Sequence, residues 1–214
     1  MFRRLFQFTI EHSLNSAYQA RLNQRGCVAE GVFWRNKSGQ FARFDELLRH
    51  VQKASPKKNT MIADVGCGYG ALYSFIKATP KYQQLLYTGV DINSAMIKAC
   101  KHQFPDEKKL FSKGRKPKHM VDFSLFSGTF NLCHTSNIEL WEAYILDNLR
   151  QSWERSRYGI VLNLLCEQKS HIRNQIYYAN RSCFIESATN LFGSTQATST
   201  TQVKGDVTFI ILRN

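Results

Sequence analysis

Two aspartates and three glycines form the group of residues that most clearly indicates chemistry. Asp64 lies inside a short apolar run, residues 61–65. Three glycines follow the run at alternate positions: Gly66, Gly68 and Gly70. A buried strand that leads into a glycine-rich turn and a helix is typical of a nucleotide-cofactor site, because glycine lets the backbone approach a ligand. Asp91 follows 25 positions after Gly66, where a carboxylate can bind ribose hydroxyls.

An alternation of strands and helices is expected to position these residues. Residues 71–79 place Leu72, Phe75 and Ile76 at helical spacing, and a strand over residues 85–91 ends at Asp91. Further strands are predicted at 110–114, 121–126 and 159–166, and further helices at 94–104, 138–155 and 183–191. Asn163 interrupts the apolar run of 159–166, a run typical of a central parallel strand, and we expect it to be buried with a partner.

Two motifs resemble a known family. The segments DVGCGYG and YTGVDINSAMIKAC resemble motifs I and II of the class I S-adenosylmethionine (SAM) dependent methyltransferases. The rival dinucleotide pattern G-x-G-x-x-G/A also fits Gly66, Gly68 and Ala71, so the glycines alone leave both cofactors open. Asp64 and the helix start at residues 93–96 favour SAM.

The resemblance covers roughly residues 57–214 and implies a Rossmann-like α/β domain. The implied mixed sheet has seven strands in the order 3-2-1-4-5-7-6, with the last strand antiparallel and helices on both faces. Two C-terminal β segments joined by a Lys-Gly-Asp turn fit that last strand. Residues 1–56 are predicted to form an N-terminal helical extension, or cap, and residues 171–182 are expected to cross the cofactor face.

The resemblance also implies which residues bind SAM. Asp91 would accept hydrogen bonds from both ribose hydroxyls, and Ile92 and Met96 would flank the adenine. The implied cofactor residues are Asp64, Gly66, Cys67, Gly68, Gly70, Asp91, Ile92, Met96 and Ser127. Trp34 and Arg43 resemble residues that hold the methionine carboxylate in small-molecule members, with packing and a surface position as the simpler alternative.

The site departs from the family pattern in two respects. Family members usually carry an acid after the glycine of the third strand, where it binds the adenine amino group, and this chain has Arg115 there. No residue is a compelling general base. The weak catalytic candidates near the expected mouth of the site are Tyr69, Asn131 and His134.

Composition narrows the class of protein. The chain has 214 residues, and 29 Lys and Arg against 16 Asp and Glu give a net charge of +13, which favours an anionic partner or a basic soluble surface. A cluster of basic residues could attract phosphates: Lys108, Lys109, Lys113, Arg115, Lys116 and Lys118. Six cysteines show no zinc-ligand spacing, so no metal is expected, and reduced thiols indicate a cytoplasmic protein. No apolar run reaches the length of a transmembrane helix.

The predicted function is methyl transfer from SAM to a small-molecule nucleophile. The chain lacks the N/D-P-P-Y/F/W motif of enzymes that methylate amino groups of nucleic acids. Two alternatives stay open: an RNA or protein methyltransferase that uses the basic surface, and a non-catalytic SAM-fold module in an assembly.

Overall fold

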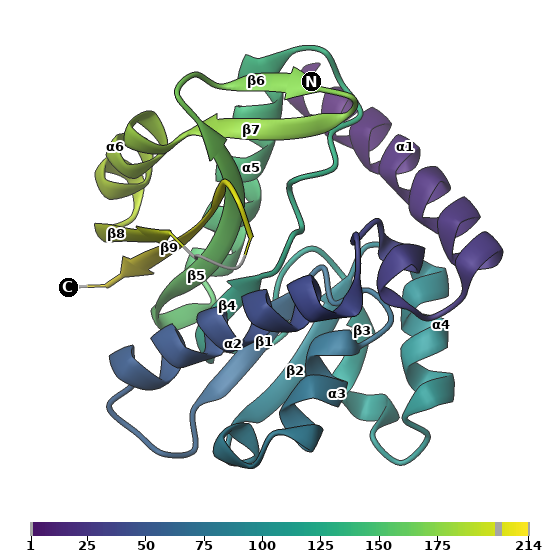
Figure 1. Cartoon of the computed structure of the whole chain (residues 1–214). Helices are drawn as coiled ribbons and strands as arrows, with labels where there is room; N and C mark the ends of the chain where they lie inside the picture. The colour runs from purple at the N-terminus through teal and green to yellow at the C-terminus, as the bar shows by residue number, and fades with distance from the viewer. Residues whose placement is uncertain (1, 200–202, 214) are drawn as a thin grey trace.

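A mixed β-sheet forms the centre of the molecule (Figure 1). The computed structural model describes residues 2–199 and 203–213. The described strands are β1 Met61–Val65, β2 Leu86–Asp91, β3 Phe111–Lys113, β4 Val121–Phe126, β5 Ser156–Glu167, β6 His171–Arg173, β7 Ile176–Asn180, β8 Ser194–Ser199 and β9 Asp206–Leu212. Strands β3, β2, β1, β4 and β5 lie side by side and are parallel. Parallel strands end at one edge of the sheet, so the segments after β1, β2 and β4 meet there.

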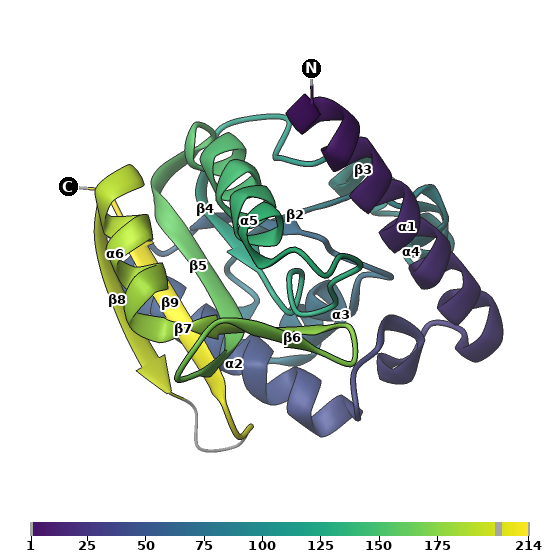
Figure 2. The same cartoon turned by 90° about the horizontal axis from the view of Figure 1, so that it is seen from above.

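Helices cover both faces of this sheet (Figure 2). The described helices are α1 Phe2–Arg25, α2 Lys37–Ala54, α3 Ala71–Ala78, α4 Ser94–Gln103, α5 Ile138–Trp153 and α6 Arg181–Leu191, with short 3-10 turns η1 Ala29–Val32, η2 Pro80–Tyr82 and η3 Lys108–Leu110. Helices α2, α3 and α4 contribute to one apolar core, and α1, α5 and α6 contribute to the other. Each face of the sheet is therefore buried, as a parallel sheet requires.

Asparagine side chains start four of these helices. Asn36, Asn93, Asn137 and Asn180 are the residues before α2, α4, α5 and α6, and each side-chain oxygen accepts a hydrogen bond from a backbone N–H of the first turn. An N-cap of this kind satisfies a donor that the helix itself leaves unpaired. The helix that follows Asp91 therefore begins at a position that the local sequence determines.

The order of the core strands confirms the predicted sheet. Without β6 and β7, the order is β3-β2-β1-β4-β5-β9-β8, which equals 3-2-1-4-5-7-6 when β8 and β9 count as strands six and seven. Strand β9 runs antiparallel to β5, as predicted. Residues 200–202, in the connection between β8 and β9, lie outside the described residues.

Residues 171–182, which were expected to cross the cofactor face, add two strands that the predicted sheet did not include. The segment forms the hairpin β6–β7, and β7 extends the far end of β5 through the pairs Cys166–Ala179 and Glu167–Asn180. Its two turn residues, Asn174 and Gln175, have φ angles of 51° and 61°. A two-residue turn with positive φ at both positions matches the twist of paired strands. Strands as short as β6 show too little alternation to be predicted, so the expected count of seven strands was too low.

The predicted extension, residues 1–56, consists of α1, η1 and α2. Helix α2 buries Leu47, Leu48 and Val51 completely against the sheet, whereas α1 lies across the edge where the parallel strands end (Figure 1). The division into an extension and a domain stays a prediction. Within the described residues, no helix combines the length and apolar character needed to cross a membrane. A cytoplasmic location also stays a prediction.

Candidate functional site

The glycine turn after β1 is held against the end of β2. The N–H groups of Gly66 and Cys67 donate to the carbonyl of Val90 at 2.8 and 3.1 Å, and the N–H of Gly68 donates to Asp91 Oδ2 at 2.9 Å. Gly66, Gly68 and Gly70 have φ angles of 81°, 54° and 87°, in the left-handed region that favours glycine. The turn and the carboxylate are therefore a single hydrogen-bonded unit.

Asp91 is a buried carboxylate that two backbone groups hold in place. The N–H of Gly68 donates to Oδ2 of Asp91, and the N–H of Asn93 donates to the other carboxylate oxygen, Oδ1, at 2.7 Å. Burial raises the pKa of Asp91, and the two N–H donors act against that shift. A carboxylate has about four acceptor positions, so both oxygens can still accept hydrogen bonds from a ligand.

Asp64 is a second buried acid beside the turn. Its side chain accepts a hydrogen bond from the hydroxyl of Tyr87 at 2.8 Å. Burial raises the pKa of Asp64 to about 7, with a further upward contribution from the charge of Asp91, while the Tyr87 hydrogen bond lowers it. Asp64 therefore changes its charge near neutral pH, unlike an ordinary aspartate.

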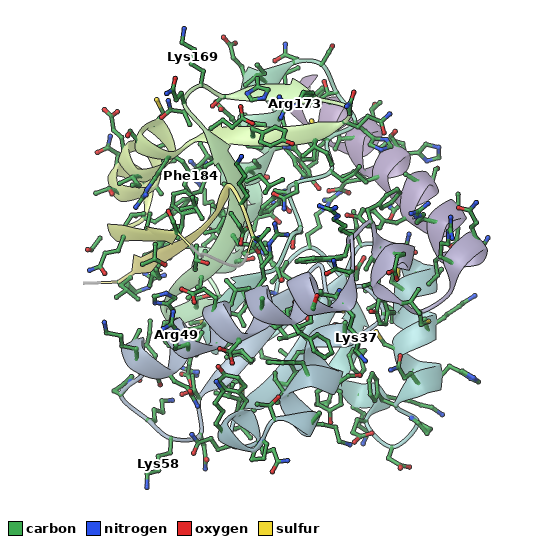
Figure 3. The ribbon with its side chains drawn as sticks, viewed as in Figure 1. Lys37, Arg49, Lys58, Lys169, Arg173 and Phe184 are labelled. Atoms are coloured by element: carbon green, nitrogen blue, oxygen red, sulfur yellow. The ribbon has the colours of Figure 1, made fainter. Side chains whose placement is uncertain are left out.

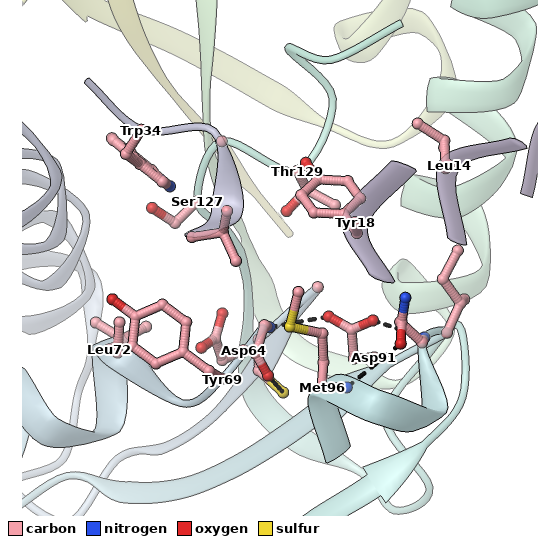
Figure 4. A pocket seen from close by; sticks show the side chains of 18 of the residues that line it. Leu14, Tyr18, Trp34, Asp64, Tyr69, Leu72, Asp91, Met96, Ser127 and Thr129 are labelled. Atoms are coloured by element: carbon pink, nitrogen blue, oxygen red, sulfur yellow. Dashed lines mark hydrogen bonds between the residues drawn. The ribbon is translucent and has the colours of Figure 1, made fainter. Parts of the chain in front are cut away.

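A cavity lies over this turn and contains most of the predicted cofactor residues (Figure 4). The predicted residues that line it are Trp34, Asp64, Gly66, Cys67, Gly68, Tyr69, Asp91, Ile92, Met96 and Ser127. Gly70 does not line it: a Cβ there would lie 2.8 Å from the ring of Phe104, so its role is packing behind the turn. We call this space the first cavity.

Helix α1 closes the first cavity from above. Leu14, Asn15 and Tyr18 line it, and sequence reasoning did not identify them. The free volume is about 100 Å³, because side chains of α1 reach toward the turn (Figure 4). A helical pattern in α1 shows which face is apolar but not which part of the molecule that face covers.

Two polar atoms of residues in this cavity wall are buried without a hydrogen-bond partner among the described residues: Asn15 Oδ1 and Ser127 Oγ. Buried polar groups are normally paired, so unpaired ones in a cavity wall are candidates for ligand contacts. Ser127 follows β4 and was predicted to face the cofactor. Asn15 comes from α1, and its only sequence signal is a polar residue beside the buried Leu14.

A second, larger cavity adjoins the first. Its volume is about 670 Å³, and it shares Tyr18, Val32, Trp34 and Gly128 with the first cavity. Its other lining residues come from the segment between η1 and α2, from α2 itself, the segment after β4, the end of β5, the β6–β7 hairpin and the turn before β9: Phe33, Arg35, Asn36, Ser38, Gly39, Arg43, Asn131, Leu132, Leu165, Ile176, Tyr178, Val203 and Lys204. The two cavities therefore lie side by side and share part of one wall.

Arg43 connects the wall of the second cavity to the core of the sheet. Its guanidinium carbon lies 4.6 Å from the centroid of the Trp34 ring, and its Nε lies 2.9 Å from Oδ1 of the buried Asp206. The same oxygen accepts a hydrogen bond from Asn163, whose own side-chain oxygen accepts from the N–H of Gly128. The prediction that Asn163 is buried with a partner is confirmed. Arg43 is 8% exposed, so it is not a surface cation.

The three weak catalytic candidates lie in different places. Asn131 lines the second cavity, and its side-chain oxygen accepts from the N–H of Leu165 at 3.3 Å. Tyr69 lines the first cavity, where burial raises its pKa to about 12. His134 lines neither: its Nδ1 lies 2.7 Å from the hydroxyl of Ser13 in a separate hollow. The structure therefore does not bring these residues together.

The predicted basic cluster lies outside both cavities. Two of its members are in ion pairs, Arg115 with the buried Glu11 at 2.6 Å and Lys116 with Glu154 at 3.9 Å. Arg115 thus joins the loop after β3 to α1. In the described part of the chain, no group of three or more potential metal-ligating side chains is present.

Comparison with known proteins supports one family. No known family profile matches the chain. A protein of Mycobacterium tuberculosis with the name "Putative methyltransferase Rv1506c" is 32% identical over 136 residues, which span 62% of this chain and 79% of the relative.

Two solved structures show the same fold. ChlM, the magnesium protoporphyrin IX methyltransferase from Synechocystis PCC 6803 with bound SAH, has a TM-score of 0.60 and 14% identity over 83% of this chain and 84% of its own. CalS10, an amino pentose methyltransferase from Micromonospora echinaspora with bound SAM, has a TM-score of 0.61 and 13% identity over 82% and 92%. The glycine turn, the strand order and the Mycobacterium tuberculosis relative all indicate the same family. The chain belongs to the class I SAM-dependent methyltransferases.

Proposed function

We propose that the chain binds SAM in the first cavity and transfers its methyl group to a small molecule in the second. The observation that carries this proposal is Asp91. Its carboxylate ends β2, is held by the N–H groups of Gly68 and Asn93, and faces the first cavity beside the glycine turn. This arrangement suits a ligand with a ribose diol.

The residues of the first cavity fit the chemistry of SAM. Asp91 offers acceptors to the ribose hydroxyls, and Met96 and Ile92 offer apolar surface to the adenine. Asn15 Oδ1 is an unpaired buried acceptor, and we assign to it the adenine amino group that Arg115 cannot bind. Ser127 Oγ lines the first cavity next to Gly128, which both cavities share, and the Trp34–Arg43 pair lies in the wall of the second; we assign the amino-acid end of SAM to this boundary.

The size of the first cavity predicts a movement of α1. Cavities for ligands of this kind have volumes of roughly 300–1,000 Å³, whereas the space here is about 100 Å³. Leu14 and Tyr18 of α1 line this space (Figure 4). We therefore expect α1 to move outward when the cofactor enters and to close over it afterwards.

The protein contributes mainly position to the reaction. SAM supplies a methyl group that is already activated by a positively charged sulfur. The walls shared by the two cavities, Tyr18, Val32, Trp34 and Gly128, would align an acceptor with that methyl group. Holding two reactants in line replaces an encounter in solution and is a large source of rate enhancement.

A small-molecule acceptor is supported by the second cavity. It has the volume of a small-ligand site, and its walls come from six separate segments of the chain. The names of ChlM and CalS10 state a porphyrin and a sugar as their substrates. The basic cluster, which would serve an RNA or protein substrate, lies away from both cavities.

The test is calorimetric titration of the wild-type protein, Asp91→Ala and Asp91→Asn with SAM and, separately, with NADH. Hydrogen bonds to a charged group contribute about 1.5–3 kcal/mol, so Asp91→Ala should weaken SAM binding by roughly 10- to 100-fold. Thermal melting of both variants checks that they fold. Unchanged SAM affinity in folded Asp91→Ala would contradict the assignment, and binding of NADH instead of SAM would replace it.

A further inference from the structure

The second cavity has a cationic wall. Three basic residues line it, Arg35, Arg43 and Lys204, and no Asp, Glu or His is among its described lining residues. Arg43 is neutralised by Asp206. Arg35 and Lys204 are exposed, and neither has an ion-pair partner among the described residues. The cavity therefore carries two positive charges that no acidic side chain of the described protein compensates.

The two cations approach the cavity from different segments. Arg35 lies between η1 and α2, and Lys204 lies in the turn before β9. Ser38 and Gly39, in the first turn of α2, line the same cavity. The N-terminus of an 18-residue helix carries partial positive charge, which adds to the same sign of potential. An anionic group would be attracted from several directions.

Apolar and aromatic surface forms the rest of the cavity. Val32, Leu132, Leu165 and Ile176 contribute apolar side chains. The ring of Tyr178 is held in place by stacking on His171, with an interplanar angle of 7°, and by Arg173, 4.9 Å from its centroid. The β6–β7 hairpin thus supplies a fixed aromatic wall. A ligand that suits this cavity combines an apolar body with an anionic group.

Among its described residues, the lining of the second cavity also lacks an effective base. Tyr18 and Tyr69, at or beside the boundary of the two cavities, have pKa values raised by burial, that of Tyr69 to about 12. Asp206 does not line the cavity and is paired with Arg43. A neutral alcohol or protonated amine would need a base to remove its proton. An acceptor that is already an oxyanion needs none.

We infer that the acceptor is a small carboxylic acid with an apolar body, that Arg35 and Lys204 bind its carboxylate, and that a carboxylate oxygen receives the methyl group. This inference rests on the proposed function. One C–O bond forms as the bond between methyl and sulfur breaks. The negative charge of the acid and the positive charge of the sulfonium are both consumed, so no proton is released and the product is a methyl ester.

The first experiment measures binding in protein saturated with S-adenosylhomocysteine. Matched pairs of acid and amide are titrated: benzoate with benzamide, phenylacetate with phenylacetamide, and cinnamate with cinnamamide. We expect the acid of at least one pair to bind about tenfold more tightly than its amide. We expect this preference to disappear in Arg35→Gln/Lys204→Gln. Equal binding of acids and amides, or no binding of any acid, would overturn the inference.

Two control variants make the result specific. Arg35→Lys/Lys204→Arg keeps both charges and should keep the preference for the acids. Lys58→Gln removes one positive charge from the exposed segment between α2 and β1 (Figure 3), which does not line the second cavity, and should also leave the preference unchanged. A preference that survives in Arg35→Gln/Lys204→Gln would show that another group binds the carboxylate.

A second experiment identifies the atom that is methylated. The acids that bind are incubated with SAM that carries a tritiated methyl group, and the product is treated with alkali. A methyl ester releases the label as volatile methanol, whereas alkali-stable label would overturn the assignment of the carboxylate as nucleophile. SAM titration of the same preparations separates the two proposals. If the wild-type protein does not bind SAM, the proposed function is wrong. If it binds SAM but does not prefer the acids to their amides, only this inference is wrong.

Discussion

Asp64 connects the cofactor site to the pH dependence of stability. Its pKa is about 7 in the folded protein, above the ordinary value of 3.8. Between these two values the unfolded chain releases a proton that the folded protein retains. The contribution of Asp64 to stability is therefore greatest below about pH 4 and is lost as the pH rises to about 7.

The variant Asp64→Asn tests this raised pKa, because asparagine keeps a hydrogen-bond acceptor for Tyr87 but cannot ionise. The difference in melting temperature, variant minus wild type, should increase by roughly 5 °C between pH 5 and pH 7.5. Above about pH 7 the difference should become constant. Melting curves at half-unit pH intervals measure it, and parallel curves for the two proteins would show that Asp64 has an ordinary pKa.

At the scale of the element, the turn between β1 and α3 depends on Gly66. A Cβ at this position would lie 2.7 Å from Cγ2 of Thr129, and φ is 81°. Gly66→Ala should therefore lower the free energy of unfolding by about 1–3 kcal/mol and weaken SAM binding. Gly114→Ala is the control, because its Cβ would meet nothing closer than 3.6 Å at a φ outside the left-handed region. Urea denaturation of both variants compares them, and equal effects would refute the steric argument.

A second element-scale prediction concerns the link from α2 to β9. Arg43 and Asp206 are 8% and 1% exposed, and burial lowers the pKa of Arg43 and raises that of Asp206. Removing one partner leaves a buried charge unpaired, so Arg43→Met or Asp206→Ala alone should cost about 3–5 kcal/mol of stability. The double variant should lose clearly less than the sum of the two single losses.

The matched control for this cycle is another ion pair of α2. Arg49 and Glu46 are paired on the same helix, but the Arg49 side chain is 63% exposed. Exposed pairs contribute about 0–1 kcal/mol, so a cycle on this pair should show weak coupling. Equal coupling in the two cycles would mean that the Arg43–Asp206 pair does not hold α2 to the sheet.

At the scale of the whole molecule, the net charge of +13 invites the idea of a nucleic-acid partner. Lys108, Lys109, Lys113 and Lys118 are exposed and lie outside the lining of both cavities. Replacing all four by Gln should leave SAM affinity unchanged within about twofold at 0.15 M salt, because none of these exposed side chains lines either cavity and salt at this concentration screens solvent-exposed charges. Calorimetry measures this, with Asp91→Ala as the variant that does respond.

The same four-lysine variant tests the alternative substrate. An RNA methyltransferase that used this surface would transfer labelled methyl to RNA in a salt-dependent way and lose that activity with the four lysines. We expect no such transfer by either protein. RNA labelling that the variant loses would favour the RNA alternative over a small-molecule acceptor.

Much of the cofactor cavity was predictable because its parts are close in sequence. Asp64, the glycines and Asp91 lie within 28 residues of one another, in a single strand–turn–helix–strand unit. Local geometry places the ends of its two parallel strands together, so spacing alone predicts a site there. The core strand order followed from the resemblance, and the structure confirms it. Whether each predicted residue contacts SAM stays a prediction.

Long-range packing accounts for what the sequence could not indicate. Tyr18 of α1, Tyr178 of the β6–β7 hairpin and Lys204 before β9 are separated by 160 and 26 positions, yet they line one cavity. Periodicity tells which side of a helix or strand is apolar, but carries no information about which distant segment covers it. Local geometry in the sequence therefore indicated a cofactor site, and the resemblance of its two motifs indicated the cofactor class. The charge and shape of the acceptor cavity arise only when α1, the hairpin and the C-terminal strands pack around it.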